Sequence, residues 1–360
     1  MPDNNHFVPY DPVSHFISCD WGTSSFRLRL VEIGNGPNAG PVGSGGLREA
    51  HTLRIVGELK DDQGVAATFQ LWKNTGKSEG ERVSFYRSIL EARVEQLQAS
   101  LVSPEPASLQ GIPLIISGMA SSSIGMKEIP YKELPFNTDG KDLRALILEA
   151  TEEYPRRTLL LSGVRSANDV MRGEETQLVG CFPPSIAGEH LFIFPGTHSK
   201  HIRVRDGKVV GFKTYMTGEY FSLLTRHSIL AGSVAESANS PESAALPESA
   251  GSPLKAFEQG VLDSIDANLL HHSFLVRTHQ LFGILSKEDN YYYLSGLLIG
   301  SECKDLIGTC LPLTLVSGGA LKDYYSRALQ ALGITDFEIQ ELDQAVITAH
   351  SRLSNSFLGK

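Results

Sequence analysis

Residues 16–29 alternate between apolar and polar side chains with a period of two, which is the pattern of a pair of β-strands. An apolar run, a Gly-Thr turn and a return run follow one another again over residues 191–200. The pattern therefore predicts two β-hairpins, with their turns at Gly22-Thr23 and Gly196-Thr197.

Helical and strand-like patterns alternate along the rest of the chain. Apolar residues at helical spacing and helix start signals predict helices over residues 81–101, 142–154, 173–181, 219–235, 256–269, 293–306 and 324–332. Continuous apolar runs predict buried strands over residues 111–119, 158–164 and 313–316. Residues 42–80, rich in Gly, Asp and Lys, predict an irregular excursion, and residues 236–253, rich in Ser, Ala, Pro and Glu, predict a mobile loop. The alternation indicates an α/β fold.

The length of the chain indicates more than one domain. Its 360 residues exceed what a single hydrophobic core commonly holds, so we expect two domains with a cleft between them. Each hairpin should open a sheet of its own. We therefore expect a flexible tail at residues 1–15, a first domain at 16–187 and a second at 188–360, with the final helix free to pack back across the boundary.

Composition narrows the class of protein. Apolar residues make up 41% of the chain and charged residues 20%, and no stretch approaches the roughly 20 apolar residues that a membrane helix needs. A net charge of -9 without a basic cluster argues against nucleic acid as a main partner. The first residues lack a secretory signal, and four scattered cysteines without a Cys-x-x-Cys pair suit buried thiols better than a metal site or disulfides. We therefore expect a cytoplasmic protein that does not span a membrane.

The two predicted turns suit the binding of phosphate. Glycine lets backbone N–H groups approach an anion closely, and Thr23, Ser24 and Thr197 add hydroxyl donors. An ordinary β-turn is the alternative for each hairpin. The strand that ends in Ser317-Gly318-Gly319-Ala320 favours the phosphate interpretation, because a Gly-Gly turn before a helix lets the backbone lie against an adenine or its ribose. We expect the two turns to face each other and hold the phosphates of a nucleotide.

Six runs of sequence point to a known family. They are Asp20-Trp21-Gly22-Thr23, Ser117-Gly118-Met119 with Gly125 and Pro130-Tyr131, Asp169-Val170-Met171-Arg172-Gly173-Glu174-Glu175-Thr176-Gln177-Leu178, Pro195-Gly196-Thr197-His198-Ser199-Lys200, Met216-Thr217-Gly218-Glu219 and Leu294-Ser295-Gly296-Leu297-Leu298-Ile299-Gly300. On these runs the chain resembles the superfamily of actin, hexokinase and heat-shock chaperone ATPases, and within it the 2-dehydro-3-deoxygalactonokinases. Two positions depart from the family's pattern, since Ser121 stands in place of a glycine and Met126 in place of a tryptophan.

The resemblance implies two ribonuclease-H-like domains of the actin/hexokinase type with a nucleotide cleft between them. It implies transfer of the γ-phosphate of ATP to the 6-hydroxyl of 2-dehydro-3-deoxy-D-galactonate, a step of galactonate breakdown. Asp20 would then hold Mg²⁺ through water, as suits a cation that keeps most of its hydration shell. The residues expected at the nucleotide are Gly22, Thr23 and Ser24 on one side of the phosphates, Gly196, Thr197 and His198 on the other, and Gly318 and Gly319 at the adenosine.

Phosphoryl transfer also needs a carboxylate that takes the proton of the attacking hydroxyl. Gly173-Glu174 resembles the Gly-Asp pair that supplies this base in related carbohydrate kinases, so we expect Glu174 to be the base. Glu175 is the first alternative, since the register against those kinases can differ by one residue, and Asp169 or no base at all is the other. Both glutamates could instead only complement a helix N-terminus.

A sugar acid presents a carboxylate, which a guanidinium can bind through two hydrogen bonds. Arg165 and Arg172 are the candidates, with Arg27 third, and a surface ion pair is the alternative for each. Asn168 and Ser117 could bind sugar hydroxyls or only cap backbone groups. The functions left open beside the expected one are a kinase for a gluconate-type sugar acid, an exopolyphosphatase, and a non-catalytic nucleotide- or sugar-binding regulator on the same scaffold. The chain could also form a homo-oligomer.

Overall fold

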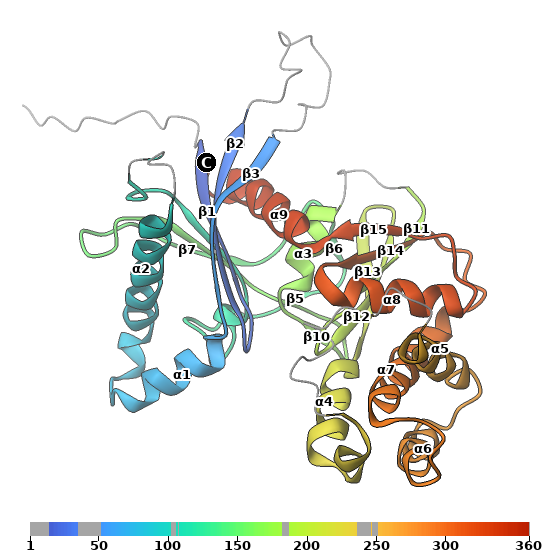
Figure 1. The fold of residues 1–360 in the computed structure, drawn as a ribbon. Coiled ribbons are helices and arrows are strands. Elements are labelled where there is room, and N and C mark those ends of the chain that lie inside the picture. Colours follow the sequence, from blue (N-terminus) through green and yellow to red (C-terminus); the bar gives the residue numbers. More distant parts are fainter. Residues whose placement is uncertain are drawn as a thin grey trace, which may run out of the picture.

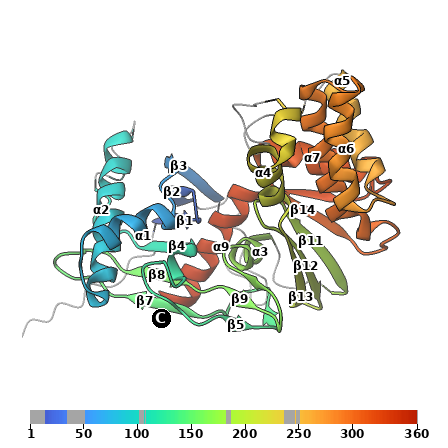
Figure 2. The same ribbon diagram turned by 90° about the horizontal axis from the view of Figure 1, so that it is seen from below.

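The computed structural model describes residues 14–34, 52–101, 106, 108–181, 187–235, 246 and 251–359. Its elements form two lobes, each built on a six-stranded sheet, and a three-stranded sheet accompanies them (Figure 1). Helices α3 (Glu174–Cys181) and α9 (Leu342–Phe357) lie between the two six-stranded sheets (Figure 2). In the described ranges, no helix is both long enough and apolar enough to cross a lipid bilayer.

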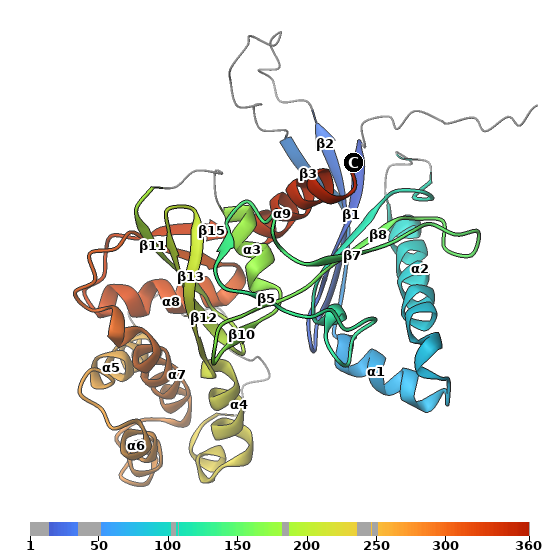
Figure 3. The same cartoon turned by 180° about the vertical axis from the view of Figure 1, so that it is seen from behind.

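The first lobe holds the first hairpin. Its strands lie in the order β3 (Thr52–Asp61), β2 (Phe26–Gly34), β1 (His15–Trp21), β4 (Leu114–Gly118), β8 (Thr158–Leu161) and β7 (Ala145–Leu148). Helices α1 (Val65–Asn74) and α2 (Arg82–Ser100) lie on the side of this sheet that faces away from the second lobe (Figure 3). Residues of α2 at helical spacing, among them Tyr86, Leu90 and Leu97, belong to the same buried cluster as Trp21 at the end of β1.

The second lobe holds the second hairpin. Its strands lie in the order β15 (Glu338–Glu341), β14 (Leu313–Ser317), β11 (Glu189–Phe194), β12 (Ser199–Arg205), β13 (Lys208–Tyr215) and β6 (Phe136–Asn137). Its helices are α4 (Thr217–His227), α5 (Ser252–Asp263), α6 (Leu269–Leu281), α7 (Lys287–Cys303) and α8 (Gly319–Ala331). The three-stranded sheet consists of β10 (Val170–Met171), β9 (Val164–Arg165) and β5 (Lys132–Glu133). Short 3₁₀ turns occupy Glu79–Glu81, Met119–Ser121, Ile229–Ser233 and Lys304–Leu306.

The two six-stranded sheets repeat one arrangement around their hairpins. In the first sheet, β1 pairs antiparallel with β2 and parallel with β4. In the second sheet, β11 pairs antiparallel with β12 and parallel with β14. The carboxyl ends of β1 and β4 therefore meet at one edge, as do those of β11 and β14, and each hairpin turn stands beside such an edge. The two hairpins lie in separate sheets, as the sequence predicts.

The two lobes share part of their core through α3 and α9. One buried cluster includes Phe16 and Ile115 of the first sheet, Phe192 of the second, and Leu353 of α9. α9 is also bonded to the first sheet, because its buried His350 makes hydrogen bonds through Nδ1 to Ser18 (2.8 Å) and through Nε2 to Ser117 (3.0 Å). The C-terminal helix thus packs back onto the first sheet.

Several sequence expectations need correction. Residues 142–154 do not form a helix, because the short apolar run Ala145–Leu148 pairs along its length with β8. Residues 42–80 are not an irregular excursion in their described part, which holds β3 and α1. The sequence shows short strand-like runs in this region but does not delimit strand β3, because β3 is an edge strand whose residues are mostly exposed or half-buried.

Other differences concern the first and last residues of predicted elements, and some predictions fall on residues that the structure does not describe. The predicted helix over residues 256–269 ends earlier, at Asp263, and begins earlier, at Ser252, so the last residues of the predicted loop 236–253 already belong to α5. Residues 236–245 and 247–250 of that loop, residues 42–51, and residues 1–13 of the predicted tail lie outside the described part of the chain. Strand β1 begins at His15, one residue before the predicted boundary.

Candidate active site

The turn between β1 and β2 is fixed by the start of α1. The N–H groups of Val65 and Ala66 donate to the carbonyls of Gly22 (2.9 Å) and Thr23 (3.0 Å). In a planar trans peptide, a carbonyl and the N–H group of the next residue point in opposite directions. The N–H groups of Thr23 and Ser24 therefore point away from α1. Both residues are exposed, so these N–H groups are available to an anion.

The turn between β11 and β12 is fixed by α4 in the same way. The N–H group of Glu219, in the first turn of α4, donates to the carbonyl of Thr197 (3.1 Å). The N–H group of His198 therefore points away from α4. Gly196 has open space where a side chain would begin, so its backbone can be approached closely.

A glycine allows the close approach of helix and turn in both places. A Cβ atom on Gly64, which precedes α1, would lie 2.3 Å from the carbonyl oxygen of Thr23. A Cβ atom on Gly218, in the first turn of α4, would lie 2.8 Å from the Cα of Thr197. Each turn is thus backed by a helix N-terminus that approaches it through a glycine. Gly218 stands in one of the family runs, whereas no motif in the sequence marks Gly64.

Asp20 lies at the carboxyl end of β1, where its side chain is 14% exposed. Its nearest cationic partner is Arg27, whose Nη1 is 3.6 Å from Oδ2, which is longer than a hydrogen bond. Burial raises the pKa of Asp20, Arg27 and Arg29 oppose this rise, and the negative charges of Asp343 and Glu174 add to it. The carboxylate is therefore an oxygen donor whose negative charge the surrounding protein does not fully offset.

Two glycines bring the start of α3 to the ends of β1 and β4. Gly118 and Gly173 have φ angles of 88° and 115°, a conformation that residues with side chains rarely adopt. A Cβ atom on Gly118 would lie 2.6 Å from the carbonyl oxygen of Trp21, and one on Gly173 would lie 3.5 Å from the Cα of Gly118. No side chain separates these segments, so the residue after Gly173, which is Glu174, begins α3 close to the edge that holds Asp20.

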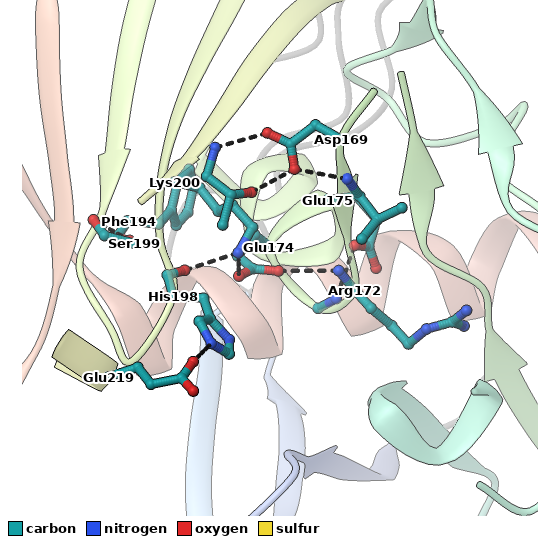
Figure 4. Close-up of polar contacts among 12 residues, drawn as sticks. Asp169, Arg172, Glu174, Glu175, Phe194, His198, Ser199, Lys200 and Glu219 are labelled. Atoms are coloured by element: carbon teal, nitrogen blue, oxygen red, sulfur yellow. Dashed lines mark hydrogen bonds and ion pairs between the residues drawn. The ribbon is translucent and has the colours of Figure 1, made fainter. Parts of the chain in front are cut away.

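Glu174 extends from α3 toward the second lobe (Figure 4). Its Oε1 lies 3.1 Å from Nζ of Lys200 on β12, and its Oε2 accepts a hydrogen bond from the N–H group of Arg172 (3.1 Å). Its side chain is 20% exposed. A ligand between the lobes can therefore reach this carboxylate.

Glu175 is placed differently, because its side chain is buried. Its Oε2 accepts from the N–H group of Gly173 (2.8 Å), and its Oε1 accepts from the hydroxyl of Thr176 (3.0 Å). Burial raises the pKa of Glu175 to about 7, and the charge of Glu174 contributes to the rise. Both oxygens are engaged at the helix N-terminus, which is the structural alternative that the sequence left open.

Lys200 also lies at the candidate site, although the sequence motifs predict no role for it. Its ammonium donates to the carbonyl of His198 in the second turn (2.8 Å) and pairs with Glu174 of α3. The lysine side chain is only 5% exposed. The sequence signal that could have identified Lys200 is its place as a charged residue at the end of the Gly196-Thr197-His198-Ser199-Lys200 run. His198 itself pairs through Nε2 with Oε2 of Glu219 (2.5 Å).

Glu302 of α7 forms a buried polar centre behind the second turn. Its carboxylate accepts hydrogen bonds from four side chains, namely Ser199 (2.5 Å), His201 (2.9 Å), Thr217 (2.5 Å) and Tyr325 (2.6 Å). His201, Glu302 and Cys303 offer ligand atoms within 4.8 Å of one another, but the hydrogen bonds already engage both carboxylate oxygens. The centre therefore joins β12, α4 and α8 to α7, and so supports the second turn.

The two leading arginine candidates have different surroundings. Arg165 is half-exposed and pairs with Glu133 on the neighbouring strand β5. The guanidinium of Arg172 lies 4.3 Å from the ring centre of Tyr131, and its Nη1 donates to the carbonyl (2.8 Å) and hydroxyl (2.5 Å) of Ser121. Among the described residues, no hydrogen-bond partner is found for the buried Nε of Arg172. Arg172 therefore has a fixed orientation, and one of its buried donors has no described partner.

Other expected contacts are engaged within the protein. The hydroxyl of Ser117 is buried against His350, and Asn168 is exposed in a turn where its side chain bonds to Ser166 (3.2 Å). Asp169 receives the N–H group (2.8 Å) and hydroxyl (2.7 Å) of Thr214 on β13. This carboxylate joins the two lobes and is poorly placed to accept a substrate proton. As substrate contacts, Ser117 and Asn168 stay predictions.

The Gly-Gly turn lies at the carboxyl end of β14. Gly318 precedes α8, and Gly319 is its first residue, with a φ angle of 57° and open space at its Cα. A flat group can therefore approach this backbone without meeting a side chain at Gly319. The edge of β14 is beside that of β11, whose turn carries Gly196 and Thr197.

Comparisons with known proteins agree with one another. The family model for 2-keto-3-deoxy-galactonokinase matches residues 20–352. The chain is 32% identical over 339 residues to the "Probable 2-dehydro-3-deoxygalactonokinase DgoK1" of Rhizobium meliloti (strain 1021), covering 92% of this chain and 94% of that protein. It is 31% identical over 230 residues to the 2-dehydro-3-deoxygalactonokinase of Escherichia coli (strain K12), covering 61% of this chain and 71% of that protein. A crystal structure from Sinorhizobium meliloti, described provisionally as a 2-dehydro-3-deoxygalactonokinase, has a TM-score of 0.72 at 30% identity, over 95% of this chain and 96% of that one.

Proposed function

The chain belongs to the family of 2-keto-3-deoxy-galactonokinases, ATP-dependent carbohydrate kinases of galactonate catabolism, and from that premise we propose how its residues carry out the reaction. The fold is α/β, of the two-domain ribonuclease-H-like type found in actin and hexokinase. We propose that the enzyme transfers the γ-phosphoryl group of ATP to the 6-hydroxyl of 2-dehydro-3-deoxy-D-galactonate. The observation that carries this proposal is the pair of turns in separate sheets, each fixed by a helix N-terminus, together with Glu174 beside them.

The proposed domains follow the two sheets, with residues 16–187 in the first and 188–360 in the second. The separate hairpins support this division. Two elements cross it, because β6 joins the second sheet and α9 bonds to the first. The domains are therefore proposed as lobes that share elements, with the nucleotide between them.

We propose that the phosphates of ATP lie between the two turns. The outward N–H groups of Thr23 and Ser24 would bind them from the first lobe, and that of His198 from the second. Gly196 and Thr197 would come close to the phosphates through their backbone, as would Gly22 on the other side. Gly318 and Gly319, at the neighbouring strand end, would accept the adenosine. Fixed N–H donors need little reorganisation as charge develops on the transferred group.

Asp20 is the proposed residue for Mg²⁺. Asp20 is a partly buried carboxylate, and its nearest arginine is 3.6 Å away, too far for a hydrogen bond. Its oxygens suit a hard cation, which prefers oxygen ligands and keeps much of its own water. When bound, the ion would neutralise charge on the phosphates. The protein's own contribution here is to hold the Asp20 carboxylate at the end of β1.

Glu174 is the proposed base. It would take the proton from the 6-hydroxyl as that oxygen bonds to the γ-phosphorus and the bond to ADP breaks. The exposure of Glu174 supports it over the buried Glu175, and the bonds of Asp169 to Thr214 argue against Asp169.

Arg172 is the proposed partner of the substrate carboxylate. Its orientation is fixed by Tyr131 and Ser121, and one of its donors has no described partner. Arg165, paired with Glu133 on the surface, is less suited. Because Ser121 departs from the family pattern and contacts Arg172, a gluconate-type sugar acid remains the second candidate substrate.

ATP-dependent metabolism also supports a cytoplasmic setting, where ATP is available, and that setting is part of the proposal. Self-association, and the expected absence of nucleic-acid and membrane partners, stay predictions.

A coupled assay of ATP consumption tests the function with epimers of 2-dehydro-3-deoxy sugar acids, gluconate and neutral hexoses. We expect the galactonate derivative to be the best substrate and glucose or galactose to be poor, since a guanidinium left without its anion is costly. Glu174→Gln should lower kcat by about two to four orders of magnitude with nucleotide affinity nearly unchanged. Arg172→Leu should raise KM for the sugar acid but not for ATP, with Arg165→Leu as the matched control.

The outcomes separate the parts of the proposal. Glucose turnover equal to that of the sugar acid would refute the substrate assignment. Near-normal turnover of Glu174→Gln would exclude Glu174 as base. If Arg165→Leu rather than Arg172→Leu raised the sugar-acid KM, the two arginines would exchange roles.

A further inference from the structure

Lys200 connects the proposed base to the second phosphate turn. Its ammonium donates to the carbonyl of His198 (2.8 Å) and lies 3.1 Å from Oε1 of Glu174 (Figure 4). We propose that Lys200 is a positioning residue of phosphoryl transfer, which holds the Glu174 carboxylate in its orientation when the second turn is in place. This inference rests on the proposed role of Glu174 as base.

The burial of the pair argues for such a role. The lysine side chain is 5% exposed and the glutamate side chain 20%, so both charges are largely removed from water. Desolvation offsets much of the attraction in such a pair, and apolar residues of similar size commonly stabilise a fold as well or better. The pair is therefore weak evidence for a role in stability. Its position, between a residue of α3 and a residue of the second turn, suits alignment of the reacting groups.

The charges around Glu174 explain what the ammonium does. Asp20 and Glu175 are its negative neighbours, and each has a pKa that the Glu174 charge helps to raise. The negative charge of Glu174 therefore lies beside two other carboxylates that repel it. Lys200 opposes them from β12, and the N–H group of Arg172 donates to the other carboxylate oxygen. Without the ammonium, the carboxylate would lose both its cation and one of its two orienting contacts.

Lys200→Met tests the proposal because it keeps the length of the side chain and removes the charge. We expect kcat to fall about a hundred-fold, as for a reacting group displaced by about an ångström, with KM for the sugar acid little changed. The acidic limb of the kcat/KM profile against pH should move upward by about one pH unit. Lys200→Arg should recover part of kcat. Lys213→Met is the matched control on the neighbouring strand β13, because Lys213 is 71% exposed and lies 4.0 Å from its partner Asp305.

A second comparison uses the Glu174→Gln background. There Lys200→Met should change kcat little further, because the group that it positions is already absent. An unmoved acidic limb, or an equal loss of kcat in both backgrounds, would overturn the role of Lys200 and leave Glu174 as the base. Near-normal turnover of Glu174→Gln alone would overturn both. If circular dichroism showed that Lys200→Met does not fold, two other variants would test the role of Lys200. They are Lys200→Arg and the double variant Glu174→Gln with Lys200→Met, and neither leaves a buried charge without its partner.

Discussion

The contribution of one buried histidine to the unfolding free energy should fall between pH 7 and pH 5. His350 of α9 is buried, and its ring nitrogens bond to Ser18 (2.8 Å) and Ser117 (3.0 Å) of the first sheet. Burial lowers the pKa of His350 to about 3, and the charge of Arg29 contributes to the decrease. The unfolded chain has a histidine pKa of about 6.5. Below that pH the unfolded state binds a proton that the folded state does not, so stability is lost as the pH falls from about 6.5 toward 3.

The magnitude follows from the two pKa values. Integrating the difference in bound protons gives a loss of about 2 kcal/mol between pH 7 and pH 5. Urea unfolding at both pH values, followed by the fluorescence of the buried Trp21 and Trp72, measures it. His350→Gln keeps a donor and an acceptor but does not titrate, so its loss over the same range should be smaller by that amount. His271→Gln, at an exposed position, is the control and should behave like the wild type. Equal losses in the wild type and His350→Gln would refute the reasoning.

Two further predictions concern the turns and the buried glutamate. Gly64→Ala should raise KM for ATP, because the new Cβ would lie 2.3 Å from the carbonyl oxygen of Thr23 and displace the first turn. Gly80→Ala is the control and should leave KM unchanged, because its Cβ would meet nothing closer than 3.9 Å. Equal KM values for both variants would contradict the role of α1. Burial raises the pKa of Glu175 to about 7, so its contribution to stability is present below about pH 4.5 and is lost as the pH rises through 7. The unfolding free energy of Glu175→Gln, measured by chemical unfolding, should therefore rise by roughly 2 to 3 kcal/mol relative to that of the wild type between pH 5 and pH 8. No change in the difference between these two proteins over that range would show that the carboxylate is not held in a costly ionised form.

The hairpins were predictable because their signals are local. A period of two and a Gly-Thr turn identify β1 with β2 and β11 with β12 without knowledge of the rest of the fold. The run Ala145–Leu148 was not, because four apolar residues fit a helix or a strand equally, and only pairing with β8 decides between them. The sequence did not predict where the C-terminal helix α9 packs, because the side of the molecule that it contacts depends on the whole fold.

The candidate site was predictable in its backbone and less so in its side chains. Gly22, Gly196, Gly218 and Glu174 stand in runs that the family shares, so a resemblance could identify them. The partners of a side chain depend on distant strands: Asp169 meets Thr214, and Ser117 meets His350, 233 residues away in the sequence. Lys200 was hidden for the same reason, because its partner Glu174 belongs to another element and nothing in the spacing shows that the two side chains meet.

The return of α9 to the first sheet has a consequence for the order in which the protein can fold during synthesis. The strand that opens the first sheet, β1, leaves the ribosome long before the helix that covers Ser18 and Ser117. Until α9 emerges, apolar residues such as Phe16 and Ile115 lack the partners with which they are buried. The N-terminal lobe therefore completes its core only after α9 has been made, so it is not an independent module that could be produced without that helix.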